Sequence, residues 1–255
     1  MNKEKYLARF GYTGPLELNL ETLAGLQLAH LLAVPFENLD IHGGPPLHLD
    51  PEGQYDKIVE RRRGGICYEL NGLFGWLLQA LGFEVVFLSA QVHGADGKPG
   101  PAFDHMALQV TLDGSRYLVD VGFGDSYMQP LRIGSTDTHR QGKDVYHLQP
   151  EGENLLLMRA TDSSEVAAPK PRPVFLLSLQ PQPLAAFEAM CRFHQSSPAS
   201  HFSRKIICSK AIPGGRISLS DHILITTEGS RRRTQRLATE ADQARALIQY
   251  FGVVR

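Results

Sequence analysis

The spacing of apolar residues changes near residue 83, and this change constrains the fold more than any other feature of the chain. Before it, the stretch 70–81 follows the i, i+3, i+4, i+7, i+8, i+11 series, which predicts a helix with one buried face that ends at Gly82. A second helix is predicted over 20–32, capped by Asn19 and stopped before Pro35. The first third of the chain is therefore predicted to be helical.

After residue 83 the pattern becomes one of short runs typical of β-strands, separated by turn residues. These runs are EVVFLSAQV (84–92), HMALQVTL (105–112), RYLVDVGF (116–123), VYHLQP (145–150), LLLMRA (155–160) and VFLLSL (174–179). Several strands at this spacing predict a small antiparallel barrel or sheet. The stretch APKPRP at 168–173 is too rich in proline for a central strand and is interpreted as a connector.

The last part of the chain mixes both patterns. A helix is predicted after Pro183 and through Met190, and strands are predicted in 204–212, 216–227 and 233–238. A final helix within 239–254 begins with a capping box of Thr239 and Asp242. Its predicted apolar stripe consists of Ala244, Leu247, Ile248 and Phe251. The order of helices, strands and then both predicts an α+β fold.

Charge and composition limit the partners of the chain. With 255 residues and a formal net charge of −1, it has no overall field that would attract nucleic acid or an acidic membrane. The basic runs 61–63 and 231–233 are interpreted as solvated surface. The start lacks the apolar core of a signal peptide, and no apolar run approaches the roughly 18 residues of a membrane span. We therefore predict a cytoplasmic protein without a nucleic-acid or membrane partner.

The cysteines and histidines indicate no metal site. Cys67, Cys191 and Cys208 are scattered and form no CxxC pair, which fits neither a disulfide framework nor a zinc site. The ten histidines show no metal-ligand spacing. Cys191 and Cys208 lack any motif context and are interpreted as inert packing residues, whereas Cys67 follows two glycines at a predicted helix start.

Cys67 is a candidate nucleophile because of that position. The first amide groups of a helix lack intrahelical partners, and the helix dipole places partial positive charge there, so a thiolate would be stabilised. Gly64 and Gly65 would let the backbone turn sharply and approach a substrate, and the amides could stabilise an oxyanion. The alternative is a small buried thiol that packs at the start of a helix.

A predicted hairpin supplies a base for this thiol. Asp113 and Gly114 suit a two-residue type I′ turn, so the numbers of two residues paired across the hairpin sum to 227. One face then collects Met106 and other apolar side chains, while the opposite, mostly polar face places Asp120 diagonally beside His105, within reach of a hydrogen bond. A cysteine, a histidine and a carboxylate form the constellation used for acyl transfer through a thioester. The pattern does not supply the distance between Cys67 and His105.

Five blocks of the sequence resemble the arylamine N-acetyltransferase family. They are YLARFGYTG near the start, VPFENLDIH at 34–42, RRGGICYELNGLF at 62–74, FDHMALQV at 103–110 and YLVDVGFGDS at 117–126, extended by SSPASHF at 196–202. The resemblance implies a helical lobe (1–83), an antiparallel β-barrel (84–182) and an α/β lid (183–255), with a core like that of cysteine proteases. It also implies ping-pong acetyl transfer from acetyl-CoA, through an acetyl-cysteine thioester, to arylamines, arylhydrazines or N-arylhydroxylamines.

The resemblance also implies roles for individual residues. The family's catalytic triad falls on Cys67, His105 and Asp120, and its acceptor pocket falls on Phe36, Phe123 and Phe202. Glu37 and Arg63 are expected to pair and hold the loop ahead of Cys67. Weak candidates for the phosphates of CoA are Lys98, Arg204 and Lys205, each of which is individually more typical of solvated charge. The chain departs from the family at Ile66, often Trp, and at 192–194, where Arg-Phe-His replaces Asn-x-Tyr.

Three alternatives remain open from the sequence. A cysteine hydrolase or transglutaminase-like enzyme would use the same triad and pass the acyl group to water or to an amine. A biosynthetic amide synthase of the same fold would differ in its acceptor, so xenobiotic metabolism and biosynthesis are not separated. A catalytically silent binding protein would be expected to lose a triad member, and none is lost.

Overall fold

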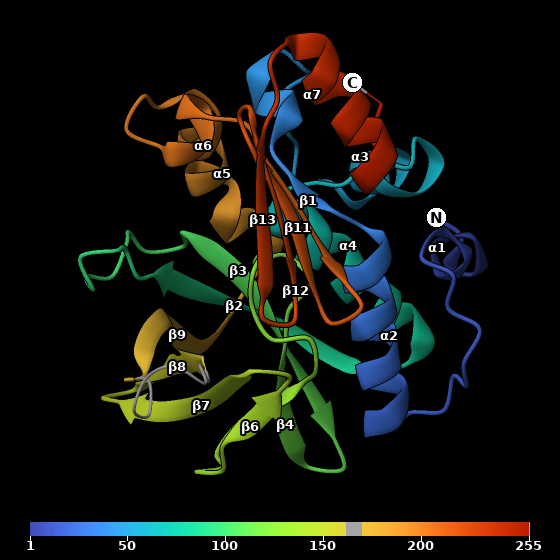
Figure 1. The fold of residues 1–255 in the computed structure, drawn as a ribbon. Helices are drawn as coiled ribbons and strands as arrows, with labels where there is room; N and C mark the ends of the chain where they lie inside the picture. The colour runs from blue at the N-terminus through green and yellow to red at the C-terminus, as the bar shows by residue number, and fades with distance from the viewer. Residues whose placement is uncertain (162–169, 255) are drawn as a thin grey trace.

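The first part of the chain is helical, as predicted (Figure 1). The computed structural model describes residues 1–161 and 170–254. Helix α2 (Leu20–Ala33) begins after Asn19, whose side chain accepts a hydrogen bond from the Thr22 amide. Helix α4 (Cys67–Leu81) ends at Gly82, which has a φ of 103°. The other elements of this part are α1 (Lys3–Arg9), the strand β1 (Phe36–Glu37), the 3-10 helix η1 (Leu39–His42), α3 (Pro51–Tyr55) and the π-helical turn η2 (Asp56–Glu60).

The predicted antiparallel barrel is an eight-stranded sheet that curls until its edge strands nearly meet (Figure 1). Its strands are β2 (Glu84–Val92), β3 (His105–Leu112), β4 (Ser115–Val119), β5 (Leu131–Arg132), β6 (His139–Gln141), β7 (Asp144–Glu151), β8 (Asn154–Thr161) and β9 (Arg172–Gln182), in the spatial order β5-β4-β3-β2-β9-β8-β7-β6. Gln141 on β6 contacts the segment ahead of β5. Its Oε1 accepts from the Met128 amide at 2.6 Å, and its Nε2 donates to the Gln129 carbonyl at 3.2 Å.

The proline-rich connector is shorter than predicted. Strand β9 begins at Arg172, and Pro173 pairs with Met158 of β8 in the interior of the sheet. The ladder shifts register between Leu157 and Met158, and a proline is tolerated at such an irregularity because no regular hydrogen bond requires its missing N–H. Residues 170–171 are not in a strand, and positions 168–169 of the predicted connector lie outside the described residues.

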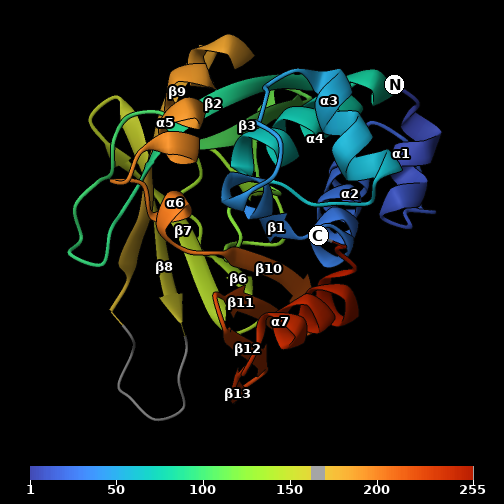
Figure 2. The ribbon, with the colours of Figure 1, turned by 90° about the horizontal axis from the view of Figure 1, so that it is seen from above.

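The last part forms a second antiparallel sheet with a helix on one face (Figure 2). We call the strands β10 to β13 the lid sheet, and β1 from the first part of the chain pairs with its edge at β10. Its elements are η3 (Leu184–Phe187), α5 (Glu188–Ser196), α6 (His201–Arg204), β10 (Ile207–Ile212), β11 (Gly215–Ser220), β12 (Ile223–Glu228), β13 (Arg231–Arg236), α7 (Glu240–Ala246) and the π-helical turn η4 (Leu247–Phe251). These findings confirm the α+β class, whereas the boundaries at 83 and 182 stay a prediction.

The apolar stripe of the last helix differs from its prediction. Ala246, Leu247 and Phe251 are buried, but Ala244 is exposed and the side chain of Ile248 is 54% exposed. The buried face also includes the side chain of Gln243, which donates a hydrogen bond to the Asp221 carbonyl at 2.6 Å. The buried face is therefore turned relative to the predicted stripe. A tertiary contact such as the bond of Gln243 leaves no trace in the apolar periodicity.

The β3–β4 hairpin lies between two cores, so both of its faces are buried at the end away from the turn. Met106 and Leu108 pack with α4 in one apolar cluster, while Ala107 and Leu118 pack with other barrel strands in a second cluster. The face predicted to be mostly polar is therefore buried in the barrel at this end, whereas Arg116 near the turn is exposed. A third cluster lies between the lid sheet and α7 and contains Leu219.

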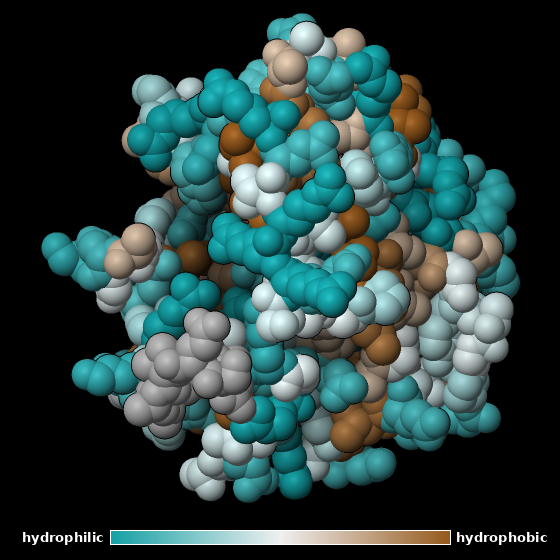
Figure 3. Space-filling view, viewed as in Figure 1, coloured by the Kyte–Doolittle hydropathy of each residue, from teal (hydrophilic) through white to brown (hydrophobic). Residues whose placement is uncertain are grey.

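The surface is hollowed between the helices α5 and α6 and the front edge of the lid sheet (Figure 3). Apolar side chains lie at the floor of this hollow, and hydrophilic side chains cover the neighbouring edge. Within the described residues, no helix is both long enough and apolar enough to cross a membrane.

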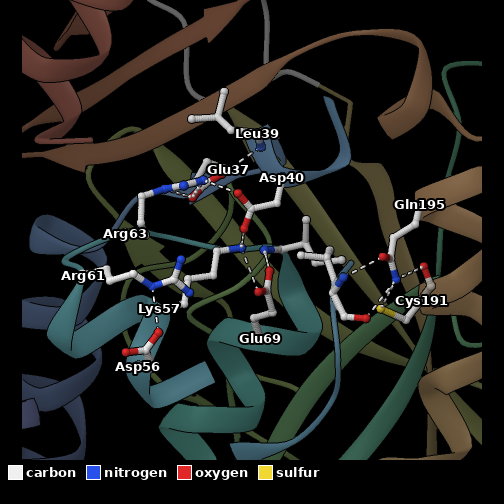
Figure 4. Close-up of polar contacts among 12 residues, drawn as sticks. Glu37, Leu39, Asp40, Asp56, Lys57, Arg61, Arg63, Glu69, Cys191 and Gln195 are labelled. Carbon is white, nitrogen blue, oxygen red and sulfur yellow. Dashed lines mark hydrogen bonds and ion pairs between the residues drawn. The ribbon is translucent and has the colours of Figure 1, made fainter. Parts of the chain in front are cut away.

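A buried ion cluster holds the segment that leads into α4 (Figure 4). The predicted pair is confirmed: Arg63 contacts Glu37 at 2.8 Å, and it also contacts Asp40 at 2.9 Å. Lys57 lies 2.8 Å from both Asp40 and Glu69. Burial alone raises the pKa of Asp40, but Lys57 and Arg63 outweigh it, and the pKa lies below its usual value. Glu69 and Arg63 thereby connect α4 to the chain around β1.

Replacing Lys57 by Ala should destabilise the fold strongly. The side chain of Lys57 is 5% exposed, and its removal would leave Asp40 and Glu69 buried without their shared counter-ion. We expect a loss of about 3–5 kcal/mol in the free energy of unfolding, measured by urea denaturation. Lys5→Ala is the matched control, because its ion pair with Glu60 is exposed, and it should leave stability almost unchanged. Equal effects of the two substitutions would contradict the role of the buried cluster.

Candidate active site

Cys67 is the first residue of α4 and is buried, with 2% of its surface exposed. Glu69 caps the helix start, because its Oε2 accepts a hydrogen bond from the Ile66 amide at 3.0 Å. The two preceding glycines serve the fold and not the approach of a substrate: both are buried, and neither lines the pocket. A Cβ at Gly64 would lie 2.0 Å from the Pro35 carbonyl oxygen, and one at Gly65 would lie 2.7 Å from Glu69.

The predicted hairpin register and its histidine–carboxylate pair are confirmed. Leu112 pairs with Ser115 across the Asp113–Gly114 turn, and the ladder continues in that register to Leu108 and Val119. Beyond its end, the His105 Nε2 lies 2.7 Å from the Asp120 Oδ2. This contact leaves Nδ1 as the imidazole nitrogen available to another partner.

The environment of His105 favours its protonated form. Burial lowers the pKa of His105, but the charge of Asp120 and its hydrogen bond outweigh burial and raise the pKa to about 10. The neighbouring sulfur of Cys67 raises this pKa further through a hydrogen bond and, as a thiolate, through its charge. The structure thus brings the three predicted residues together, with Cys67 and His105 facing one pocket.

Asn71 is a site residue that the sequence analysis missed. Its Nδ2 donates to the Met106 carbonyl at 2.6 Å and to the Asp120 Oδ1 at 2.8 Å, while its Oδ1 accepts from the Val121 amide at 2.9 Å. The predicted strand 116–123 ends at Val119. Beyond it, the side-chain amide of Asn71 takes the place of the next backbone hydrogen bonds between the two strands. The sequence signal that could have identified Asn71 was its position four residues after Cys67, on the same helix face.

Gly122 allows the hairpin end to touch the helix that carries Cys67. A Cβ at this position would lie 2.7 Å from the Cys67 Cα and 2.8 Å from the Asn71 Nδ2. The glycine is thus required by close approach and not by its backbone angles. Its amide donates to the Asp120 Oδ1 at 2.7 Å, so the same residue also orients the carboxylate.

The pocket has a volume of about 310 Å³ and is lined by aromatic and small polar side chains. Phe36, Phe123 and Phe202 all line it, as predicted from the resemblance. The rings of Phe36 and Phe202 lie 5.7 Å apart, and Phe123 meets the His105 ring edge-on at 5.2 Å. Three serines of the lid sheet, not identified from the sequence, also line the pocket: Ser209, Ser218 and Ser220.

The three weak candidates for CoA phosphates separate in the structure. Lys205 lines the pocket, whereas Lys98 and Arg204 do not. Lys98 is in the turn that follows Gly94, whose amide donates to the Lys98 carbonyl at 2.9 Å. A role for any of the three in binding remains a prediction.

His194 is buried, although the sequence analysis placed it among polar surface or locally hydrogen-bonded groups. Its Nδ1 lies 3.0 Å from the Ser200 Oγ, and its Nε2 lies 3.2 Å from the Asp104 Oδ1. The ring also stacks on Tyr68, the neighbour of Cys67, at 6.0 Å. At the departure from the family pattern in 192–194, His194 therefore packs against the neighbour of Cys67.

The other two cysteines are buried, in agreement with the interpretation that they are inert. Burial raises the pKa of Cys191 to about 12 and also raises the pKa of Cys208. Among residues 1–161 and 170–254, no group of three or more His, Cys, Asp or Glu side chains is arranged to hold a metal ion.

Asn71→Ala should disturb both stability and the reactivity of Cys67. The substitution would leave the Val121 amide and the Met106 carbonyl buried without partners, which costs about 1–3 kcal/mol for each group. We expect lower stability in urea and slower alkylation of Cys67 by iodoacetamide under conditions in which the variant is folded. Gln79→Ala on the same helix removes one bond, to the Val85 carbonyl, at an exposed residue and is the control. Unchanged alkylation in Asn71→Ala would exclude a positioning role.

The stability contributed by protonated His105 should depend on pH. Because its folded pKa of about 10 exceeds the ordinary value of 6.5, the contribution is complete below about pH 6.5 and is lost as the pH rises through about 10. The difference in free energy of unfolding between the wild type and His105→Gln should therefore shrink from about pH 6 to about pH 10. Exposed His222→Gln serves as the control and should show no such trend. A constant or growing difference would contradict the raised pKa.

Known proteins resemble this chain along most of its length. A family model described as N-acetyltransferase matches residues 19–254. The chain is 35% identical over 243 residues to arylamine N-acetyltransferase, pineal gland isozyme NAT-10, of Gallus gallus, covering 89% of this chain and 84% of the relative. It is 33% identical over 254 residues to the arylamine N-acetyltransferase of Mycolicibacterium smegmatis, covering 97% and 90%.

Solved structures show the same architecture. The Mycobacterium marinum arylamine N-acetyltransferase superposes with a TM-score of 0.90 at 31% identity, over 99% of this chain and 93% of that one. The M. marinum arylamine N-acetyltransferase in complex with CoA superposes with a TM-score of 0.89, at the same identity and coverage. From the matching family model, these identities and the shared fold, it follows that the chain belongs to the arylamine N-acetyltransferase family.

Proposed function

We propose that this protein transfers an acetyl group from acetyl-CoA to arylamines, arylhydrazines or N-arylhydroxylamines through an acetyl-cysteine thioester on Cys67. The observation that carries the proposal is a buried cysteine beside a histidine that a carboxylate holds, at the floor of an aromatic pocket. Membership of the arylamine N-acetyltransferase family supports the acetyl donor and the acceptor class. A relative of similar fold has been solved with CoA bound.

In the first half-reaction the Cys67 thiolate attacks the acetyl carbonyl carbon, and a new carbon–sulfur bond forms. The backbone N–H groups at the start of α4 lack intrahelical acceptors and are suited to stabilise the oxyanion. When the intermediate collapses, the bond to the CoA sulfur breaks, and His105 gives its proton to that sulfur. The high pKa of His105 means that this proton is present at neutral pH.

In the second half-reaction the amine nitrogen attacks the acetyl-cysteine carbonyl. His105, now neutral, takes the proton that the amine loses, and the bond between the carbonyl carbon and Cys67 breaks. The thiolate and the protonated imidazole are then restored. Asp120 keeps the imidazole in the tautomer and orientation that both steps need.

The pocket walls support an aromatic acceptor. The rings of Phe36 and Phe202 face the same cavity as Phe123, and flat apolar walls suit a flat aromatic amine. The site draws on all three predicted segments: Cys67 comes from 1–83, His105 and Asp120 from 84–182, and Phe202 from 183–255. We propose that these segments act as one enzyme unit around the pocket.

Brief exposure to acetyl-CoA without an acceptor should acetylate Cys67. Intact-protein mass spectrometry should show a gain of about 42 Da, the mass of one acetyl group on a thiol. The adduct should be absent in Cys67→Ser and retained in Cys191→Ser, which removes another buried thiol. Addition of an arylamine should then remove the adduct and release the N-acetyl product.

Other outcomes would favour the alternatives. No adduct on the wild type would overturn the acetyl-enzyme mechanism. Rapid loss of the adduct to water, with no amide formed, would indicate a hydrolase. Acyl transfer from a peptide amide without transfer from acetyl-CoA would indicate a transglutaminase-like enzyme.

A further inference from the structure

The lid sheet presents one face to the active-site pocket. Ser209 and Ser218 are partners across β10 and β11, their hydroxyl oxygens lie 2.9 Å apart, and both line the pocket. Ser209 also donates to the carbonyl of Gly124, another residue of the pocket wall, at 3.0 Å. On the opposite face, Leu219 and Leu224 pack in the core beneath α7. We call the first side the pocket face of the sheet.

The register carries the pocket face outward to the edge strand. The ladders β11–β12 and β12–β13 are regular, so side chains in line across them share a face. Arg216 is in line with Thr227 and then Arg232. Ser220 is in line with Ile223 and then Arg236. Arg232 and Arg236 are therefore on the pocket face, two strands from the pocket wall, or about 10 Å at the usual strand spacing.

These two arginines are exposed cations without a partner in the part of the chain that the structure describes. Arg232 and Arg236 are exposed, and they form no ion pair with any described residue. The arginines closer to the pocket are already engaged. Arg159 and Arg216 each lie 3.3 Å from a carboxylate oxygen of Asp125. The pocket face thus has satisfied charges near the site and unsatisfied positive charges at its outer edge.

We infer that Arg232 and Arg236 bind the phosphate groups of the acyl donor, an inference that rests on the proposed function. Coenzyme A is a thiol at the end of a long uncharged arm, with its phosphates at the far end. With the thioester at Cys67, the arm runs along the serines of the pocket wall, and the phosphates reach the edge strand. Guanidinium groups suit phosphate because their planar N–H donors form paired, charge-assisted hydrogen bonds.

Strand β13 also provides a matched control. Arg231 and Arg233 alternate with Arg232 and are therefore on the opposite face, in line with Glu228 and Thr226. They have the same charge, the same exposure and nearly the same position in the chain. A general electrostatic effect would act through all four arginines, whereas a binding site would depend on one face.

The test compares two double variants with two donors. We would measure the second-order rate constant for acetylation of Cys67, once with acetyl-CoA and once with the acetyl thioester of N-acetylcysteamine, which has no phosphate. In Arg232→Ser/Arg236→Ser the rate constant with acetyl-CoA should fall about tenfold or more, while the rate constant with the neutral donor should be unchanged. In Arg231→Ser/Arg233→Ser both rate constants should stay within about twofold of the wild type. High salt should reduce the difference between the two variants.

Three results would overturn the inference. The first is an unchanged rate constant with acetyl-CoA in Arg232→Ser/Arg236→Ser. The second is an equal fall of this rate constant in the two double variants. The third is an equal fall with both donors in Arg232→Ser/Arg236→Ser. Failure of the proposed function looks different, because the wild type would then form no acetyl-enzyme with either donor. Retention of most of the acetyl-CoA rate in Arg232→Lys/Arg236→Lys would further support a site for phosphate charge.

Discussion

The contact between the start of α4 and the open end of the β3–β4 hairpin is the interaction on which the site depends. Cys67 comes from a helix and His105 from a strand, and neither element can position the other by itself. Asn71 joins them by bonding to Met106, Asp120 and Val121. Gly122 permits the approach, since any side chain there would collide with the Cys67 backbone. One helix turn therefore sets both the place of Cys67, the proposed nucleophile, and the orientation of the pair formed by His105 and Asp120.

Two buried groups of charges flank this contact and do different work. On one side, Lys57 and Arg63 bind three carboxylates and fasten the segment ahead of Cys67 to the chain near β1. On the other side, Asp120 raises the pKa of His105 and keeps the imidazole protonated beside a thiol. Both groups are buried in the protein interior. There, charge pairs interact more strongly than in water, and an unpaired charge costs more free energy. The first group supports the scaffold, and the second belongs to the proposed catalytic site.

Much of the fold and the site was predictable because local rules decide it. The Asp113–Gly114 turn sets the hairpin register, and with it the contact of His105 with Asp120, because a two-residue turn leaves no freedom in pairing. The apolar series 70–81 predicted helix α4 and its end at Gly82. Predictions failed where a distant contact overrides the local pattern. The last helix buries Gln243, which bonds to the Asp221 carbonyl, and the second core buries Ala107 and Leu118 on the hairpin face that looked polar.

The sequence alone predicted most of the helices and strands, the hairpin register and, through its family blocks, the three residues proposed for the site. These depend on turn geometry, helix caps and side-chain spacing, which act over a few residues. Tertiary structure alone decided the distance from Cys67 to His105, the role of Asn71 and the reason for Gly64 and Gly65. It also decided which arginines of β13 share a face with the pocket. Each of these depends on which surfaces of separate elements come into contact, and no local rule encodes that packing.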